Sequence, residues 1–258
     1  MKTKIICLIC FLFFTNLFSI EIKTIHVVVA LCDNENQGII PVPQHLGDGK
    51  SPATNLYWGA LYGVKTFFTN SPNWKLLDHS SGINESIAER VIFVHSNNDA
   101  FLIADAYYGW AIKEAIMDVI ESACGQKEDS LKIDYDSLEY KAGIYGGADL
   151  LAYIGHNGLM EFTYDYDLEK TTTNLTAIII LACDSQSYFK TYLEDTGINP
   201  LIVTTGLMAP EAYTLENVVN GWINKESAKE IRLRAARTYN EYQKCGIKAA
   251  LRLFDNKW

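Results

Sequence analysis

Basic residues are scarce and scattered in this chain. Lys and Arg number 22 against 31 Asp and Glu, which gives a formal net charge of -9 over 258 residues. Nucleic acids are bound mostly through clustered Lys and Arg, so this balance argues against a nucleic-acid partner. Hydrophobic residues make up 48% and charged residues 21%, as in ordinary globular proteins. The composition excludes a disordered, collagen-like or disulfide-knot protein, but it leaves enzyme, binding module and structural protein open.

Long apolar runs are also missing, with one exception at the N-terminus. Residues 5–18 are almost unbroken apolar sequence, and Lys2 and Lys4 precede them. This run is short for a membrane span, so we predict a signal peptide over residues 1–19, with a membrane anchor as the alternative. No second such run follows, and we therefore expect an exported protein, periplasmic or extracellular, with no stable membrane span after cleavage. The remaining 239 residues carry 20 basic and 31 acidic side chains, and we expect a single domain over residues 20–258.

Cysteines are few once the signal peptide is set aside. Cys7 and Cys10 lie in it, which leaves Cys32, Cys124, Cys183 and Cys245. Export permits disulfides, but a core of this size needs none, so the pairing of Cys32, Cys124 and Cys245 stays open.

The common nucleotide, hydrolase and metal motifs are absent. Gly49-Lys50-Ser51 ends like a phosphate-binding loop, but Gln44 occupies the position of its first glycine. The chain contains neither G-x-S-x-G nor H-E-x-x-H, and His45 and His79 have no ligand cluster near them in the sequence. We therefore expect no cofactor and no metal.

Short apolar runs point to an α/β fold. Residues 22–31, 149–155, 177–182 and 200–205 read as buried strands, and 90–95 and 100–104 as shorter strands around a turn. Helices are predicted over 55–68, from an Asp105 cap to Cys124, and after the capping-box pair Ser227 and Glu230. Residues 126–148 are polar and weakly patterned. Apolar strands alternating with amphipathic helices predict a three-layer α/β/α sandwich with a mostly parallel central sheet.

Two polar residues follow strong strands, where ligands gather in parallel sheets. His156 follows the strand at 149–155, and Cys183 follows the strand at 177–182. If these strands are neighbours, the imidazole can promote the thiolate and later protonate a leaving amine. A glycine such as Gly158 lets a backbone N–H approach an oxyanion. The alternatives are that Cys183 is a packing residue and that His156 is a loop residue bonded to backbone.

The segments A-Y-I-G-H-N-G and I-I-I-L-A-C-D-S resemble those of the caspase-like cysteine peptidases, which include caspases, legumains, gingipains, clostripain-type enzymes and separases. In these families the His block precedes the Cys block, each after a parallel core strand. The resemblance implies that His156 is the general acid/base, that Cys183 is the nucleophile and that Gly158 helps to form the oxyanion hole. Asn157 stands where the family usually has glycine.

Acidic residues near these two blocks are candidate substrate contacts. Asp184, next to Cys183, is the best placed to influence a basic substrate side chain, although packing or helix capping is the preferred reading. Asp165, Asp167 and Glu169 form a stretch that is a solvated loop or a substrate contact. The sequence thus predicts an exported cysteine endopeptidase acting on protein or peptide substrates. A catalytically inactive binding or scaffold protein of the same fold, or an unrelated α/β ligand-binding module, is the alternative.

Overall fold

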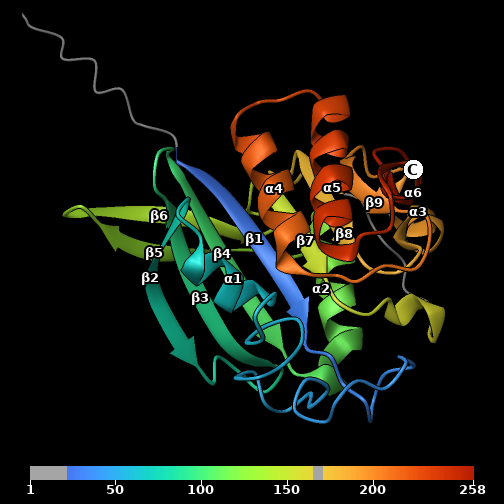
Figure 1. Cartoon of the computed structure of the whole chain (residues 1–258). Coiled ribbons are helices and arrows are strands. Elements are labelled where there is room, and N and C mark those ends of the chain that lie inside the picture. Colours follow the sequence, from blue (N-terminus) through green and yellow to red (C-terminus); the bar gives the residue numbers. More distant parts are fainter. Residues whose placement is uncertain (1–21, 165–170) are drawn as a thin grey trace, which may run out of the picture.

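The computed structural model of the chain describes residues 22–164 and 171–258. The predicted signal peptide, residues 1–19, and the acidic residues Asp165, Asp167 and Glu169 lie outside these ranges. The described residues form a mixed α/β fold with one large sheet and a separate two-stranded hairpin (Figure 1).

The large sheet has eight strands in the order β10-β9-β8-β7-β1-β4-β3-β2. The central five, from β9 to β4, run parallel, and the strands outside them are antiparallel to their neighbours. The strands are β1 (Lys23–Ala30), β2 (Trp74–Ser81), β3 (Ile87–His95), β4 (Ala100–Tyr107), β7 (Leu150–Ile154), β8 (Ala177–Leu181), β9 (Asn199–Thr204) and β10 (Phe254–Asp255). The apolar runs that predicted strands in the sequence thus correspond to β1, β3, β4, β7, β8 and β9.

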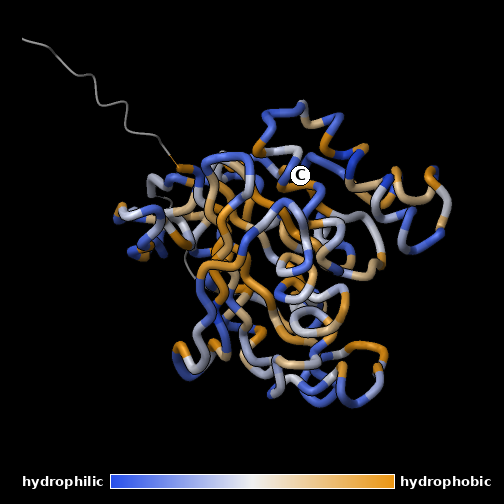
Figure 2. Tube along the Cα trace, turned by 60° about the vertical axis from the view of Figure 1, so that its left-hand side comes forward, coloured by the Kyte–Doolittle hydropathy of each residue, from blue (hydrophilic) through white to orange (hydrophobic). Residues whose placement is uncertain are grey.

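Helices cover both faces of this sheet. Along β1, Val27 and Val29 enter one core while Val28 and Ala30 enter the other, which is the two-residue alternation of a strand. The first core contains residues of α1, α4, α5 and α6, and the second contains residues of α2 and α3. Figure 2 shows the hydrophobic residues concentrated along the central strands. The helices are α1 (Val64–Asn70), α2 (Ile112–Ala123), α3 (Ser185–Leu193), α4 (Ala212–Ile223), α5 (Ala228–Gln243) and α6 (Ile247–Leu253), with short 3-10 turns at Gly109–Ala111 and Gly158–Met160.

Residues 126–148, whose sequence is polar and weakly patterned, contain a β-hairpin. It consists of β5 (Glu128–Tyr135) and β6 (Leu138–Tyr145) and projects from the body of the molecule in Figure 1. Ile133, Ala142 and Ile144 of the hairpin pack with Phe101 and Ile103 of β4 in a third hydrophobic cluster. Alternate positions of both strands are apolar, and charged side chains between them mask that pattern.

Two predicted helices begin later than expected. The helix predicted over 55–68 starts only at Val64, because Asn55 fixes the preceding turns through hydrogen bonds with both backbone groups of Cys32. Asp105 does not cap a helix. It lies buried in β4, and α2 begins at Ile112 without a side-chain cap. The predicted ends elsewhere are confirmed, since Gly125 follows α2 with a φ of 75° and Ser227 and Glu230 form the capping box of α5.

The parallel strands bring the candidate residues to one end of the sheet. The carboxyl ends of β1, β7 and β8 point the same way because these strands pair in parallel. The long loop after β1 gathers at this end (Figure 1). Ligand sites in open α/β sheets form where such loops meet.

Candidate functional site

His156 and Cys183 follow neighbouring parallel strands. The last paired residues of β7 and β8 are Ile154 and Leu181, so His156 and Cys183 each stand two positions beyond the same rung. Both side chains line one cavity of about 300 Å³. The structure therefore brings together the two residues that the sequence placed at one sheet edge.

The His156 ring is held by a carboxylate. His156 is 9% exposed, and its Nε2 lies 2.6 Å from Oε1 of Glu161. A carboxylate only accepts hydrogen bonds, so Nε2 carries the proton and Nδ1 is the basic nitrogen of the neutral ring. The same Glu161 oxygen accepts the backbone N–H of Gly38 at 2.6 Å, which ties the loop after β1 to this ring. Below it, the Tyr153 hydroxyl donates to the His156 carbonyl at 2.7 Å.

Cys183 is half-buried at the start of α3 and contacts the loop after β9. The backbone N–H of Met208 lies 3.4 Å from the Cys183 sulfur, and the Met208 carbonyl lies 3.6 Å from it. Beneath Cys183, Ser185 donates its hydroxyl to the carbonyl of Ile180 at 2.9 Å, which fixes the turn from β8 into α3. The thiol therefore lies just beyond the carboxyl end of β8 rather than within the sheet.

Asn157 joins the two segments. It is fully buried, its side-chain amide donates to the carbonyl of Cys183 at 2.7 Å, and its carbonyl oxygen accepts the N–H of Leu159 at 3.2 Å. An amide at this position makes both bonds, whereas a glycine would make neither. Asn157 therefore fastens the histidine segment to the cysteine segment.

Gly158 and Asp184 lie beside the cavity without lining it. Gly158 opens a buried 3-10 turn, and a Cβ there would stand 2.6 Å from the ring of Phe162, so packing alone explains the glycine. Asp184 adopts a left-handed conformation, with φ of 46°, and accepts the Ser187 hydroxyl at 3.0 Å. The oxyanion role of Gly158 and the substrate contact of Asp184 both stay predictions.

Sequence reasoning missed most of the cavity wall. The wall is apolar apart from the His156 ring, the Cys183 thiol and one tyrosine, and it comes from loops after β1, β7 and β9. It is lined by Gly38, Ile39, Ile40, Tyr57, Gly155, His156, Met160, Cys183, Leu207, Met208 and Pro210. Of these residues, the sequence singled out only His156 and Cys183, each of which follows a predicted strand. Glu161, five positions after His156, carried no signal beyond being the nearest carboxylate downstream of it.

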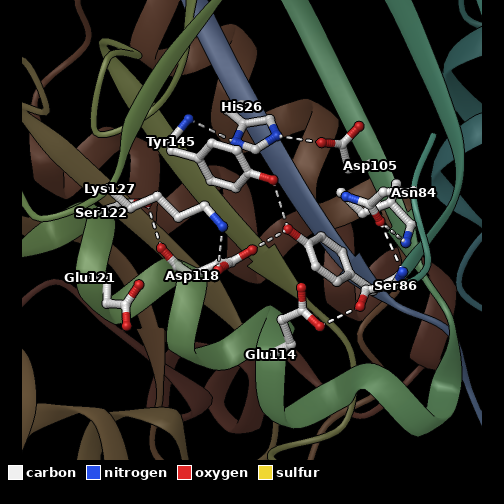
Figure 3. A network of polar contacts seen from close by, with 12 residues as sticks. His26, Asn84, Ser86, Asp105, Glu114, Asp118, Glu121, Ser122, Lys127 and Tyr145 are labelled. Carbon is white, nitrogen blue, oxygen red and sulfur yellow. Dashed lines mark hydrogen bonds and ion pairs between the residues drawn. The ribbon is translucent and has the colours of Figure 1, made fainter. Parts of the chain in front are cut away.

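A second polar constellation lies inside the molecule, between the sheet, α2 and the hairpin (Figure 3). Asp105 accepts two hydrogen bonds from Arg90, both at 2.6 Å, and lies 3.1 Å from Nε2 of His26. Nδ1 of His26 accepts the backbone N–H of Tyr145 at 3.0 Å. Burial opposes ionisation of Asp105, but the bonds from Arg90 and His26 outweigh it and hold its pKa below the usual range.

The network continues through two tyrosines to a second carboxylate. The hydroxyls of Tyr145 and Tyr107 are 2.8 Å apart, and Tyr107 donates to Asp118 at 2.5 Å. Lys127 completes the chain with an ion pair to Asp118 at 2.5 Å. Burial raises the pKa of Asp118 despite its bonds to Lys127 and Tyr107.

Of the cysteines in the described residues, Cys32 and Cys124 are buried, Cys183 is half-buried and Cys245 is exposed. Within residues 22–164 and 171–258, no group of three or more His, Cys, Asp or Glu side chains is arranged to hold a metal ion. In the same ranges no helix combines the length and the apolar character needed to cross a bilayer.

Comparison with known proteins gives no assignment: no protein-family model, curated protein or solved structure matches the chain.

Proposed function

We propose that this protein is an exported cysteine endopeptidase of the caspase-like kind. The observation that carries the proposal is the placement of His156 and Cys183 two positions beyond the same rung of β7 and β8, on one cavity. The order of the two blocks and their strand contexts, which resemble the caspase-like families, support the same reading. Export rests on the signal peptide predicted over residues 1–19, and the substrates are proteins or peptides.

The proposed chemistry uses the two side chains in turn. Cys183 gives its proton to His156, and the sulfur attacks the carbonyl carbon of the scissile peptide bond. The imidazolium then protonates the departing amine, and the C–N bond breaks to leave a thioester on Cys183. His156 next takes a proton from water, whose oxygen attacks the thioester, and it returns that proton to the sulfur. The products are two shortened peptides and the free thiol.

Glu161 is the positioning residue in this scheme. Its bond to Nε2 selects the tautomer in which Nδ1 accepts the thiol proton, and its negative charge stabilises the imidazolium that results. The N–H of Met208, directed at the sulfur, stabilises negative charge there. Gly158 is proposed, by the resemblance, to supply an oxyanion donor once substrate is bound.

The first test is selective alkylation of the thiols. In a Cys245→Ser background, iodoacetamide at pH 8 is expected to modify Cys183 and to leave Cys32 intact, because Cys32 is fully buried and burial raises its pKa to about 11. Peptide mapping by mass spectrometry reads both sites. Equal, slow modification of Cys183 and Cys32 would contradict an activated Cys183.

The second test is cleavage. The chain without residues 1–19 should hydrolyse members of a peptide library, and its Cys183→Ala variant should not. The alternative is a binding protein of the same fold, and the contact of the thiol with the Met208 carbonyl favours it, because a thiol hydrogen directed at that carbonyl is not directed at His156. That alternative predicts no cleavage and an unchanged biological activity in Cys183→Ala.

A further inference from the structure

The cavity next to Cys183 is apolar at its mouth as well as in its wall. Ile40 is 88% exposed, Leu207 is 75% exposed and Met160 is 44% exposed, and all three line this cavity. They come from three separate loops, after β1, after β9 and after β7. Single exposed apolar residues are ordinary on protein surfaces, but a convergent apolar patch around a concave site marks a binding surface.

No charged side chain lines the cavity among the described residues. The carboxylates nearest to the lining residues in the sequence already accept hydrogen bonds from other groups of the protein. Glu161 is bonded to His156 and Gly38, and Asp184 takes the Ser187 hydroxyl. Glu211, next to the lining residue Pro210, accepts hydrogen bonds from Tyr213 and Gln243.

In the described part of the chain, a charged substrate side chain would therefore find no Asp, Glu, Lys or Arg in the cavity wall. Burying an unpaired charge is far more costly than burying an apolar group, and an apolar side chain gains free energy on leaving water. The volume of about 300 Å³ is sufficient for one large side chain.

We propose that this cavity selects an apolar substrate side chain, so that the protein cleaves peptide bonds after large apolar residues such as leucine, methionine or phenylalanine. The inference rests on the proposed peptidase function. Ile40 and Leu207 are the specificity-determining residues, because they flank the entrance and their side chains are exposed enough to be replaced without loss of the fold.

The test compares substrates that differ at one position, and it measures them with the wild-type protein and with matched variants. With fluorogenic peptides that differ only in the residue before the scissile bond, leucine, methionine and phenylalanine should exceed arginine, lysine and aspartate in kcat/KM by about tenfold or more. Leu207→Asp and Ile40→Asp should lower kcat/KM for the leucine substrate and raise it for the arginine substrate. Leu138→Asp is the control, because Leu138 is 59% exposed on the hairpin, away from the cavity, and its replacement should change neither value.

A second readout separates this inference from the peptidase proposal. With the Cys183→Ala protein, fluorescence anisotropy should show tighter binding of a leucine-containing peptide than of its arginine counterpart, and Leu207→Asp should remove the difference. Cleavage that depends on Cys183 but favours charged residues would overturn the apolar selection and keep the peptidase. If the leucine peptide binds more tightly but no peptide is cleaved, the inference about the cavity stands and the peptidase proposal is wrong. Equal binding of both peptides would overturn the inference whether or not cleavage occurs.

Discussion

Within the described residues His26, His79 and His156 contact carboxylates, and the surroundings of His26 and His156 differ in a way that separates a structural role from a chemical one. His26 is fully buried and uses both ring nitrogens, one toward Asp105 and one toward the backbone of Tyr145. His156 lines an open cavity, and within the described residues only its Nε2 is hydrogen-bonded. A ring with both nitrogens engaged has no site left for a transferred proton, whereas His156 keeps one.

The carboxylates differ in the same sense. Asp105 is buried and neutralised by Arg90, so its network contributes to the fold and is closed to solvent. The Glu161 side chain is 37% exposed, and it contacts the His156 ring and the backbone N–H of Gly38 in the loop after β1. The contrast predicts that changes at the His26 network alter stability, and that changes at the His156 site alter activity. The following predictions test that separation, from the largest expected effect to the smallest.

Removing the thiol should have the largest effect. Cys183→Ala is expected to lower kcat/KM by about 10⁴-fold or more, because the nucleophile is lost while binding is kept. His156→Ala should have a loss of similar size. Urea denaturation should show that Cys183→Ala changes the free energy of unfolding by less than about 1 kcal/mol. A variant that unfolds easily would instead mark this site as part of the structural core.

Replacing the buried carboxylate should act on stability alone. Asp105→Asn leaves Arg90, whose side chain is only 13% exposed, without its counter-ion and is expected to cost about 3–5 kcal/mol in the free energy of unfolding. Urea titrations give this value, and residual activity per folded molecule should remain unchanged. A loss of kcat/KM in the folded fraction would show that the His26 network also affects activity, and it would contradict the proposed separation of the two regions.

The same variant has a pH signature. The pKa of Asp105 is lowered in the folded state, so its contribution to stability is complete above the ordinary carboxyl value of 3.8 and is lost as pH falls through the lowered value. Asp105→Asn should therefore lose stability relative to the wild type at pH 7, and the gap should narrow on acidification below about pH 4. A gap that is constant with pH would mean that the charge of Asp105 is not what stabilises the fold.

Weakening the support of His156 should have an intermediate effect on activity. Glu161→Gln keeps the shape but removes the charge, and we expect kcat to fall by about 10–100-fold with KM little changed. Glu161→Asp keeps the carboxylate and should restore part of the rate. Glu139→Gln, at an exposed hairpin ion pair, is the control and should change neither parameter.

The smallest effect is expected at the outer end of the buried network. Lys127 is 32% exposed at its side chain, so Lys127→Met should cost about 1 kcal/mol in the free energy of unfolding near pH 7. Burial raises the pKa of Asp118 in the fold, so this carboxyl is increasingly protonated as pH falls and needs the lysine less. The cost should therefore shrink in urea titrations below about pH 5, and a cost that grows on acidification would contradict this assignment.

The sequence predicts the central strands well and the connections poorly. The buried strands β1, β7 and β8 are short runs of apolar residues, and such runs are distinctive without tertiary information. Asp105 was misread because a carboxylate before a helix resembles a cap, whereas its partners Arg90 and His26 come from other strands. The hairpin was missed because its apolar face is completed only by β3 and β4.

The candidate site divides in the same way. His156 and Cys183 are visible because each directly follows a strong strand, and parallel pairing brings strand ends together. Glu161, Met208 and Ile40 come from loops, and their positions depend on contacts such as Gly38 with Glu161 that no local pattern encodes. The apolar character of the cavity, which bears most on substrate choice, therefore emerges only from the folded chain.

The pairing of β10 with β9 has a consequence for how the molecule avoids self-association. Phe254 and Asp255 pair with Val203 and Thr204, and the Leu253 carbonyl accepts the N–H of Thr205 at 2.9 Å. This short strand thus occupies hydrogen-bonding groups of β9 that would otherwise template a strand from a second molecule. Removing residues 254–258 would expose the hydrogen-bonding groups of β9 and also take Phe254 out of the first core, so the shortened chain should be less stable and should associate edge to edge.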